Sequence, residues 1–263
     1  MSTHDLGTPH LRFERDGHIA MLQIDRPAAR NALSRAMYFG IKRAVELVNG
    51  FEEPTALLIT GTGDVFAPGG ELRGREDDAY PELDTLTGAD VIPFEAVRQS
   101  QAPVVSAVNG ICQGGGLLIA MLSDVAVASE RASFRAPELF RGIADMGYAA
   151  YLPHQVGLAM ARDMLLTGRK LDAAEARDCG LVSRVTAHAE LLDRAREAAE
   201  DILCTGPDSR LQVKRALNAQ YGLVDFMSFW ASVRGPEARE GMTAFAEKRP
   251  PAWVPKTLAR GRL

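Results

Sequence analysis

The spacing of hydrophobic residues changes several times along the first third of the chain. Residues 11–24 carry strand-like residues on both sides of a central Asp-Gly pair that accepts a left-handed turn, so a β-hairpin is predicted there. Ser34 precedes apolar residues at helical spacing that end at an Asn-Gly pair, which predicts an amphipathic helix. The apolar run at residues 56–60 predicts a buried strand, so the order is strand, strand, helix, strand.

The same order of elements recurs further along the chain, although no repeat of the letters is detectable. A helix is predicted at residues 91–100, a strand at 104–108, an apolar helix at 117–122 that three glycines open, and a strand at 124–128. Between the two series, residues 73–89 are acidic, turn-rich and without periodicity, which predicts a mobile loop. The pattern therefore indicates a repeating ββα architecture.

Strand patterns end at about Tyr148, and the remainder of the sequence is predicted to be helical. An Asp-Ala-Ala-Glu capping box starts one helix at Asp172. The other predicted helices cover residues 160–166, 190–203, 209–219 and 225–245. We therefore expect an α/β part followed by a helical part.

Composition narrows the class of protein without indicating a function. With 46% apolar and 24% charged residues, the 263 residues are typical of a globular chain of one large domain, or of a domain with an appended piece. The net charge of −4 argues against nucleic acid as a partner. The three cysteines form no C-x-x-C pair and are interpreted as core or near-core thiols in a reducing compartment. The polar N-terminus and short apolar runs indicate a cytoplasmic protein without a membrane segment.

Two glycine-containing turns are the candidate chemistry left after the common signatures are considered. The sequence holds no P-loop, no G-x-G-x-x-G after a strand, no G-x-S-x-G and no H-E-x-x-H, and its five histidines have no metal-ligand spacing. The turns lie at residues 66–72 and 110–117. Their glycines let the backbone approach a ligand, and an N–H group at the start of the helix that follows Gly114 can stabilise an oxyanion. Glycine placement alone favours the alternative, in which the turns only let helices pack on strands.

Residues 105–116, VSAVNGICQGGG, and the following MLSDV at residues 121–125 resemble the signature of the crotonase superfamily, also called the enoyl-CoA hydratase/isomerase family. The resemblance implies an α/β fold with a ββα spiral core at residues 1–195 that binds acyl-CoA. It also implies a C-terminal helical trimerisation region at residues 196–263 that covers CoA. The resemblance spans nearly the whole chain and continues through residues 24–33, 60–72, 165–168, 173–176, 180–182 and 240–249.

The same resemblance implies the chemistry of the two turns. Members of the family hold a CoA thioester so that its carbonyl oxygen accepts hydrogen bonds from two backbone N–H groups, which by motif position belong to Gly70 and Gly115 here. Such donors stabilise an enolate-like thioester. Because CoA enters as part of the substrate, no separate cofactor and no metal are expected. Acyl-CoA is the expected partner, and a homotrimer, or a homohexamer built as a dimer of trimers, is the expected assembly.

Contacts to acyl-CoA are implied at further positions. Arg30 and Ala32 match contacts to pantetheine and the phosphates, Ala67 matches a contact near adenine, and Lys248 comes from the C-terminal tail. The alternative for Arg30 and Lys248 is a solvated surface cation, and Glu71 is interpreted more readily as a structural acid. The implied substrate-binding set is Arg30, Ala32, Ala67, Gly70, Glu71, Leu72, Gly114, Gly115, Leu118, Phe245 and Lys248.

Two carboxylates are candidate catalytic groups. Hydratases of the family use two glutamates, of which the second matches Glu138 and the first matches Leu118, a side chain that cannot transfer a proton. A carboxyl against an apolar wall has a raised pKa, so Glu138 is predicted to act as the sole acid/base group; the alternative is a glutamate that only begins a helix. Asp145 matches a functional aspartate of non-hydratase members, and it serves either as nucleophile, acid or base, or only as a helix cap.

Three hypotheses for the function follow. The leading one is an enoyl-CoA hydratase or isomerase of fatty-acid or related acyl-CoA metabolism, in which Leu118 shifts the expectation from hydration toward isomerisation. Asp145 leaves open a dehalogenase-like or ring-isomerase-like chemistry of the same family. The second hypothesis is an acyl-CoA-binding protein without catalysis, which Leu118 also motivates. The third is the RNA-binding role of one branch of the family, against which the net charge of −4 argues.

Overall fold

The computed structural model describes residues 2–71 and 87–255. Leu72 and almost all of the loop predicted at residues 73–89 therefore lie outside the described residues. The chain forms two units, the first from residues 1–134 and 171–220 and the second from residues 135–170 and 221–263. The predicted division at residue 195, with substrate binding before it and oligomerisation after it, stays a prediction.

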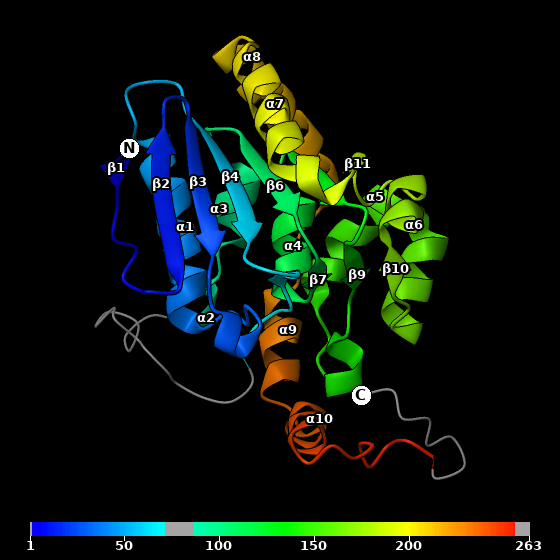
Figure 1. Cartoon of the computed structure of the whole chain (residues 1–263). Coiled ribbons are helices and arrows are strands. Elements are labelled where there is room, and N and C mark those ends of the chain that lie inside the picture. Colours follow the sequence, from blue (N-terminus) through cyan, green and yellow to red (C-terminus); the bar gives the residue numbers. More distant parts are fainter. Residues whose placement is uncertain (1, 72–86, 256–263) are drawn as a thin grey trace. The chain divides into compact units, whose positions relative to one another are not determined.

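A seven-stranded sheet forms the centre of the first unit (Figure 1), in the order β1-β2-β3-β4-β6-β8-β11. β1 and β2 run antiparallel to their neighbours, and every pair from β3 to β11 is parallel. All residues of β4 and β6 are buried, as expected for parallel strands that are covered on both faces. The strands are β1 (Ser2–Thr3), β2 (Leu11–Asp16), β3 (Ile19–Ile24), β4 (Ala56–Gly61), β6 (Val104–Val108), β8 (Val125–Ser129) and β11 (Arg184–Thr186).

Helices cover the two faces of this seven-stranded sheet. On one face, α7 (Leu191–Leu203) packs its buried alanines against Leu58 and Val105. The opposite face receives α1 (Arg35–Asn49), whose apolar stripe is buried (Figure 1). The side chain of Ser34 accepts a hydrogen bond from Met37 N at 3.2 Å, so the predicted hairpin and the predicted helix start are both confirmed.

A smaller sheet carries the two glycine turns. Its order is β10-β9-β7-β5, and β5 and β7 pair in parallel. Each of these two strands leads directly into one of the turns, and α4 (Gly115–Leu122) begins at the second turn. The strands are β5 (Val65–Ala67), β7 (Ile111–Gln113), β9 (Ser133–Arg135) and β10 (Leu171–Asp172), and the remaining helices of the first unit are η1 (Pro27–Ala29), α2 (Gly88–Val91), α3 (Phe94–Gln99), α6 (Ala173–Asp178), η4 (His188–Glu190) and α8 (Pro207–Asn218).

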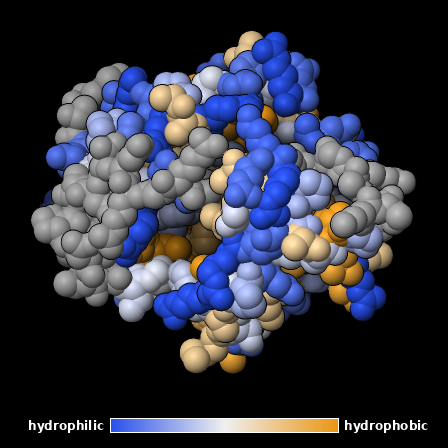
Figure 2. Space-filling view, turned by 90° about the horizontal axis from the view of Figure 1, so that it is seen from below, coloured by the Kyte–Doolittle hydropathy of each residue, from blue (hydrophilic) through white to orange (hydrophobic). Residues whose placement is uncertain are grey.

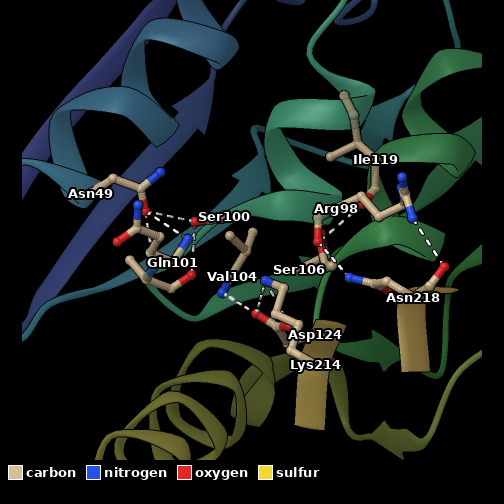
Figure 3. Close-up of polar contacts among 12 residues, drawn as sticks. Asn49, Arg98, Ser100, Gln101, Val104, Ser106, Ile119, Asp124, Lys214 and Asn218 are labelled. Carbon is tan, nitrogen blue, oxygen red and sulfur yellow. Dashed lines mark hydrogen bonds and ion pairs between the residues drawn. The ribbon is translucent and has the colours of Figure 1, made fainter. Parts of the chain in front are cut away.

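Polar side chains fix the start of β6, the strand that precedes the second turn (Figure 3). Asn49 Oδ1 accepts hydrogen bonds from Ser100 Oγ, Gln101 N and Ala102 N at 3.0, 3.0 and 2.8 Å. Asp124 accepts from Val104 N at 2.8 Å and from Lys214 Nζ at 2.9 Å, which ties β6 to α8. The N–H groups of Gln101, Ala102 and Val104 are thus satisfied by side chains rather than by a neighbouring strand.

The second unit is helical around the segment that contains Glu138. A Cβ atom at Gly241 would overlap the backbone of Arg141, so only glycine allows the two segments to approach so closely. Ser232 Oγ accepts a hydrogen bond from Ala144 N at 3.1 Å. These contacts join η3 (Glu138–Arg141) and the start of α5 (Met146–Thr167) to α9 (Phe226–Val233) and α10 (Pro236–Ala246).

Three expectations from the sequence are wrong. Strands do not end at Tyr148, because β10 pairs with β9 and β11 extends the main sheet beside β8. The helix predicted at residues 91–100 is broken by Pro93, and the one at 225–245 is broken before Pro236, since proline lacks the N–H that would continue a helix. Cys204 is exposed rather than near the core, whereas Cys112 is buried and Cys179 is half-buried.

Hydrophilic residues cover much of the coloured part of the face drawn in Figure 2, where hydrophobic residues occur in small groups. Among the described residues, no helix is both long and apolar enough to cross a membrane.

Candidate functional site

The two glycine turns of the first unit lie against each other. Gly69 O accepts a hydrogen bond from Leu33 N at 2.9 Å, and Glu71 N donates to Leu33 O at 2.8 Å, so the first turn is fixed on both sides of Gly70. A Cβ atom at Gly69 would lie 3.3 Å from Gly114 Cα and 3.5 Å from Gly115 N. Gly69 also has a φ of 106°, a conformation that favours glycine.

The N–H groups of Gly70 and Gly115 are placed to receive an acceptor. Within residues 2–71 and 87–255, neither N–H finds a hydrogen-bond acceptor. Gly70 is exposed and Gly115, the first residue of α4, is half-buried. The N-terminus of a helix adds partial positive charge to the second donor. Two N–H groups on adjoining turns form an arrangement that can stabilise a negatively charged oxygen.

Glu71 has a structural partner. Its carboxylate forms an ion pair with Arg26, with oxygens 2.8 and 3.3 Å from the two terminal guanidinium nitrogens, and both side chains are largely buried. Arg26 also donates to Ala32 O at 3.2 Å, and its own N–H donates to Asn31 Oδ1 at 2.9 Å. This network holds the first turn against residues 26–33. The sequence analysis did not single out Arg26 or Asn31 for this role.

The remaining predicted binding residues of the first unit differ in accessibility. Arg30 is exposed and has a φ of 51°, and Ala32 is half-buried. Leu118 is 2% exposed and Ala67 has no exposed surface. A Cβ atom at Gly116 would overlap Ala67 O, so the packing explanation of the glycines holds at this position. Ala67 thus has no surface for adenine in this conformation.

In the second unit, Glu138 is half-buried, and one of its carboxyl oxygens points away from solvent. Its Oε2 atom is out of contact with solvent and has no hydrogen-bond partner among the described residues. Burial raises the pKa of Glu138 to about 8, and the negative charge of Asp145 raises it further, against the opposing charges of Arg141 and Arg135. A carboxyl with this pKa exchanges protons readily near neutral pH.

Asp145 caps a helix. Its Oδ1 atom accepts hydrogen bonds from Gly147 N at 2.9 Å and Tyr148 N at 3.2 Å at the start of α5. Burial raises the pKa of Asp145 to about 6, while the two backbone hydrogen bonds act in the opposite direction. The capping alternative is therefore realised, and a catalytic role for Asp145 stays a prediction.

Arg141 is a further charged group beside Glu138 that the sequence analysis did not single out. Its guanidinium lies over the ring of Phe245, 4.7 Å from the ring centroid. Its Nε–H is buried and finds no acceptor in the part of the chain that the structure describes. Burial lowers the pKa of Arg141, and the charge of Glu138 opposes this effect. Lys248, at the end of α10, is exposed.

Replacing Arg141 with methionine is expected to raise the pKa of Glu138 further, because the positive charge that favours the carboxylate is lost. The ionisation that the predicted base Glu138 needs then occurs at higher pH. The measurement is the pH dependence of kcat/KM for a thioester substrate, in which the limb near pH 8 should move upward. Arg169→Met is the matched control, because Arg169 pairs with Asp163 on the surface; equal pH profiles for the two variants would contradict the expectation.

The described residues contain no group of three or more His, Cys, Asp or Glu side chains that could hold a metal ion.

Comparison with known proteins gives consistent matches along the chain. A family model described as enoyl-CoA hydratase/isomerase matches residues 14–256. A Dictyostelium discoideum protein named "Probable enoyl-CoA hydratase, mitochondrial" is 32% identical over 248 residues, which cover 91% of this chain and 89% of the relative. A carnitinyl-CoA dehydratase of Salmonella enteritidis is 32% identical over 256 residues, 92% of this chain and 97% of that protein.

Solved structures agree with the sequence matches. The crystal structure of an enoyl-CoA hydratase/isomerase from Pseudoalteromonas atlantica superposes with a TM-score of 0.80 and 32% identity, covering 93% of this chain and all of the other. The predicted α/β fold class with a helical C-terminal region is confirmed by this similarity.

Proposed function

Because the chain belongs to the enoyl-CoA hydratase/isomerase family, we propose that it forms the enolate of an acyl-CoA thioester. The N–H groups of Gly70 and Gly115 bind the thioester oxygen, and Glu138 moves the proton. The observation that carries the proposal is the Glu138 carboxyl: its Oε2 atom is buried without a partner among the described residues, and its pKa is about 8. Folding alone does not explain such a group, because a buried carboxyl oxygen without a partner costs stability.

The oxyanion part of the proposal is supported by the turn geometry. When a base removes a proton next to the thioester carbonyl, the electron pair moves onto the carbonyl oxygen as negative charge. Two N–H groups on adjoining turns that already lie in place stabilise this charge without reorganisation, and each donor contributes about 3 kcal/mol. The un-ionised ground-state thioester carries less charge on oxygen and gains less from the same donors.

Leu118 favours isomerisation over hydration as the proposed reaction. Hydration needs one group for the attacking water and a proton for the α-carbon, and Leu118 supplies neither. Isomerisation needs a single acid/base group: the Glu138 carboxylate removes the α-proton of a 3-enoyl-CoA, and the resulting carboxylic acid returns a proton to the γ-carbon to give the 2-enoyl-CoA. Since the base must be ionised, the rate should rise with pH until about pH 8.

The proposal assigns CoA recognition to the set of residues named from the resemblance. Arg30 and Lys248 are exposed cations that suit the phosphates of CoA. A homotrimer or homohexamer is part of the same proposal. Leu223 and Met227, which are 98% and 84% exposed, are apolar side chains that such an assembly would shield from water.

Mass spectrometry of 2-enoyl- and 3-enoyl-CoA thioesters incubated with the protein in D₂O separates the reactions. We expect double-bond migration with incorporation of deuterium and without addition of D₂O. Addition of D₂O would establish hydration despite Leu118 and would direct attention to Asp145, whose pKa of about 6 makes it a second titrating carboxyl. Tight binding of CoA thioesters without any mass change would instead support the non-catalytic alternative.

A further inference from the structure

The hydroxyl of Tyr38 lies at the two glycine turns. Tyr38 is on the first turn of α1, and a Cβ atom at Gly115 would overlap Tyr38 Oη. A Cβ atom at Gly70 would lie 3.5 Å from the same oxygen. The phenol oxygen therefore lies against Gly115 and near Gly70, the two residues that carry the proposed oxyanion donors.

The ring of Tyr38 is held in place by its neighbours. It packs edge-to-face against Phe94 of α3, with ring centroids 6.0 Å apart and an interplanar angle of 81°. The ring also borders the cluster of Ala36 and Val91. Tyr38 N donates to Ser34 O at 3.0 Å, and Ser34 caps the helix, so the backbone is fixed as well. The hydroxyl is thus preorganised on a regular element rather than on a loop.

The edge-to-face contact with Phe94 does not involve the hydroxyl, because phenylalanine would make the same contact. A phenol is a neutral hydrogen-bond donor below about pH 10, and its donor strength grows toward a charged acceptor. A donor at this position is therefore matched to an oxygen that gains negative charge during the reaction.

We infer that the Tyr38 hydroxyl is a third hydrogen-bond donor to the thioester oxygen, beside the N–H groups of Gly70 and Gly115; this inference rests on the proposed function. The hydroxyl keeps its proton throughout, and no covalent bond to Tyr38 forms. As the enolate develops, the hydrogen bond to its oxygen shortens and stabilises the charge.

The test compares two ligands of the Tyr38→Phe variant. Acetoacetyl-CoA binds as an enolate that absorbs in the near ultraviolet, whereas butyryl-CoA stays un-ionised. We expect Tyr38→Phe to weaken binding of the enolate at least about tenfold, the effect of losing one hydrogen bond to a charged group, and to leave butyryl-CoA binding within about twofold. Tyr221→Phe is the matched control, because it also removes a phenol hydroxyl. The Tyr221 hydroxyl accepts a hydrogen bond from Gln155 Nε2 and does not belong to the two turns.

Two results would overturn the inference. Unchanged enolate binding would show that the hydroxyl makes no contact with the oxygen, and an equal loss for both ligands would show that it only shapes the pocket. A wild-type protein that binds butyryl-CoA but shows no preference for the enolate would refute the proposed function itself. If Tyr38→Phe does not fold, 3,5-difluorotyrosine at the same position keeps the ring and lowers the phenol pKa. At a pH at which this phenol stays protonated, that variant should bind the enolate more tightly, and unchanged binding would again overturn the inference.

Discussion

Replacing Gly70 with proline is expected to lower kcat for enolate formation by about 10²–10³-fold, because proline lacks the N–H group that is proposed to bind the thioester oxygen. The neighbouring hydrogen bonds of Gly69 O and Glu71 N to Leu33 do not use that N–H and are expected to remain. The measurement is kcat for the substrate identified in D₂O, together with the thermal unfolding temperature of each variant.

Gly70→Ala is the matched control for this substitution. Its Cβ atom would meet Tyr38 Oη at 3.5 Å, an ordinary van der Waals contact, and Gly70 does not have a positive φ. Alanine also keeps the N–H, so kcat should stay near the wild-type value. Equal losses in the alanine and proline variants would mean that the shape of the turn, and not its N–H, matters.

Replacing Glu138 with glutamine is expected to lower kcat by about 10²–10⁴-fold, the usual contribution of a general acid/base group. Glutamine fills nearly the same volume but cannot transfer the proton, so the affinity for CoA thioesters should change much less. The measurement is kcat and thioester affinity in parallel. A variant with full turnover would show that another residue moves the proton.

The same substitution should stabilise the protein at alkaline pH. The pKa of Glu138 is about 8 in the folded state, against an ordinary value of about 4.5, so the folded protein holds this proton more tightly. The stability gained from that proton is complete below about pH 4.5 and is lost as the pH rises toward 8. Glutamine stays neutral, so at pH 8–9 the free energy of unfolding of Glu138→Gln should exceed that of the wild type by up to several kcal/mol, and the variant should unfold at a higher temperature. Both differences should vanish near pH 4. A pH-independent difference would contradict the raised pKa.

Elements with strong local signals could be predicted from the sequence. The Asp-Gly turn, the Ser34 cap and the capping box at Asp172 each depend on residues within one turn of chain, and all three are present in the structure. The strand β11 could not be found in this way. It has only three residues, Arg184–Thr186, and they are strand residues because β8 offers a parallel edge, which is a tertiary effect.

The residues of the candidate site also differ in whether local or tertiary effects determine them. Motif position alone predicts Gly70 and Gly115 as donors, and the contact between their turns is a short-range consequence of the strands that precede them. The pKa of Glu138 depends on burial, and the position of Arg141 depends on Phe245, more than a hundred residues later in the chain. Tyr38 looks like any half-buried helical residue until its hydroxyl is placed beside Gly115.

The most direct test of the account is proton exchange at the α-carbon of a saturated thioester. Butyryl-CoA in D₂O offers no double bond to hydrate or to move, so any deuterium that the protein adds requires enolate formation. We expect the wild-type protein to incorporate deuterium at the α-carbon, and the Glu138→Gln and Gly70→Pro variants to bind the thioester without exchange. Tight binding of butyryl-CoA by the wild type with no deuterium incorporated would contradict the proposal that this protein forms thioester enolates.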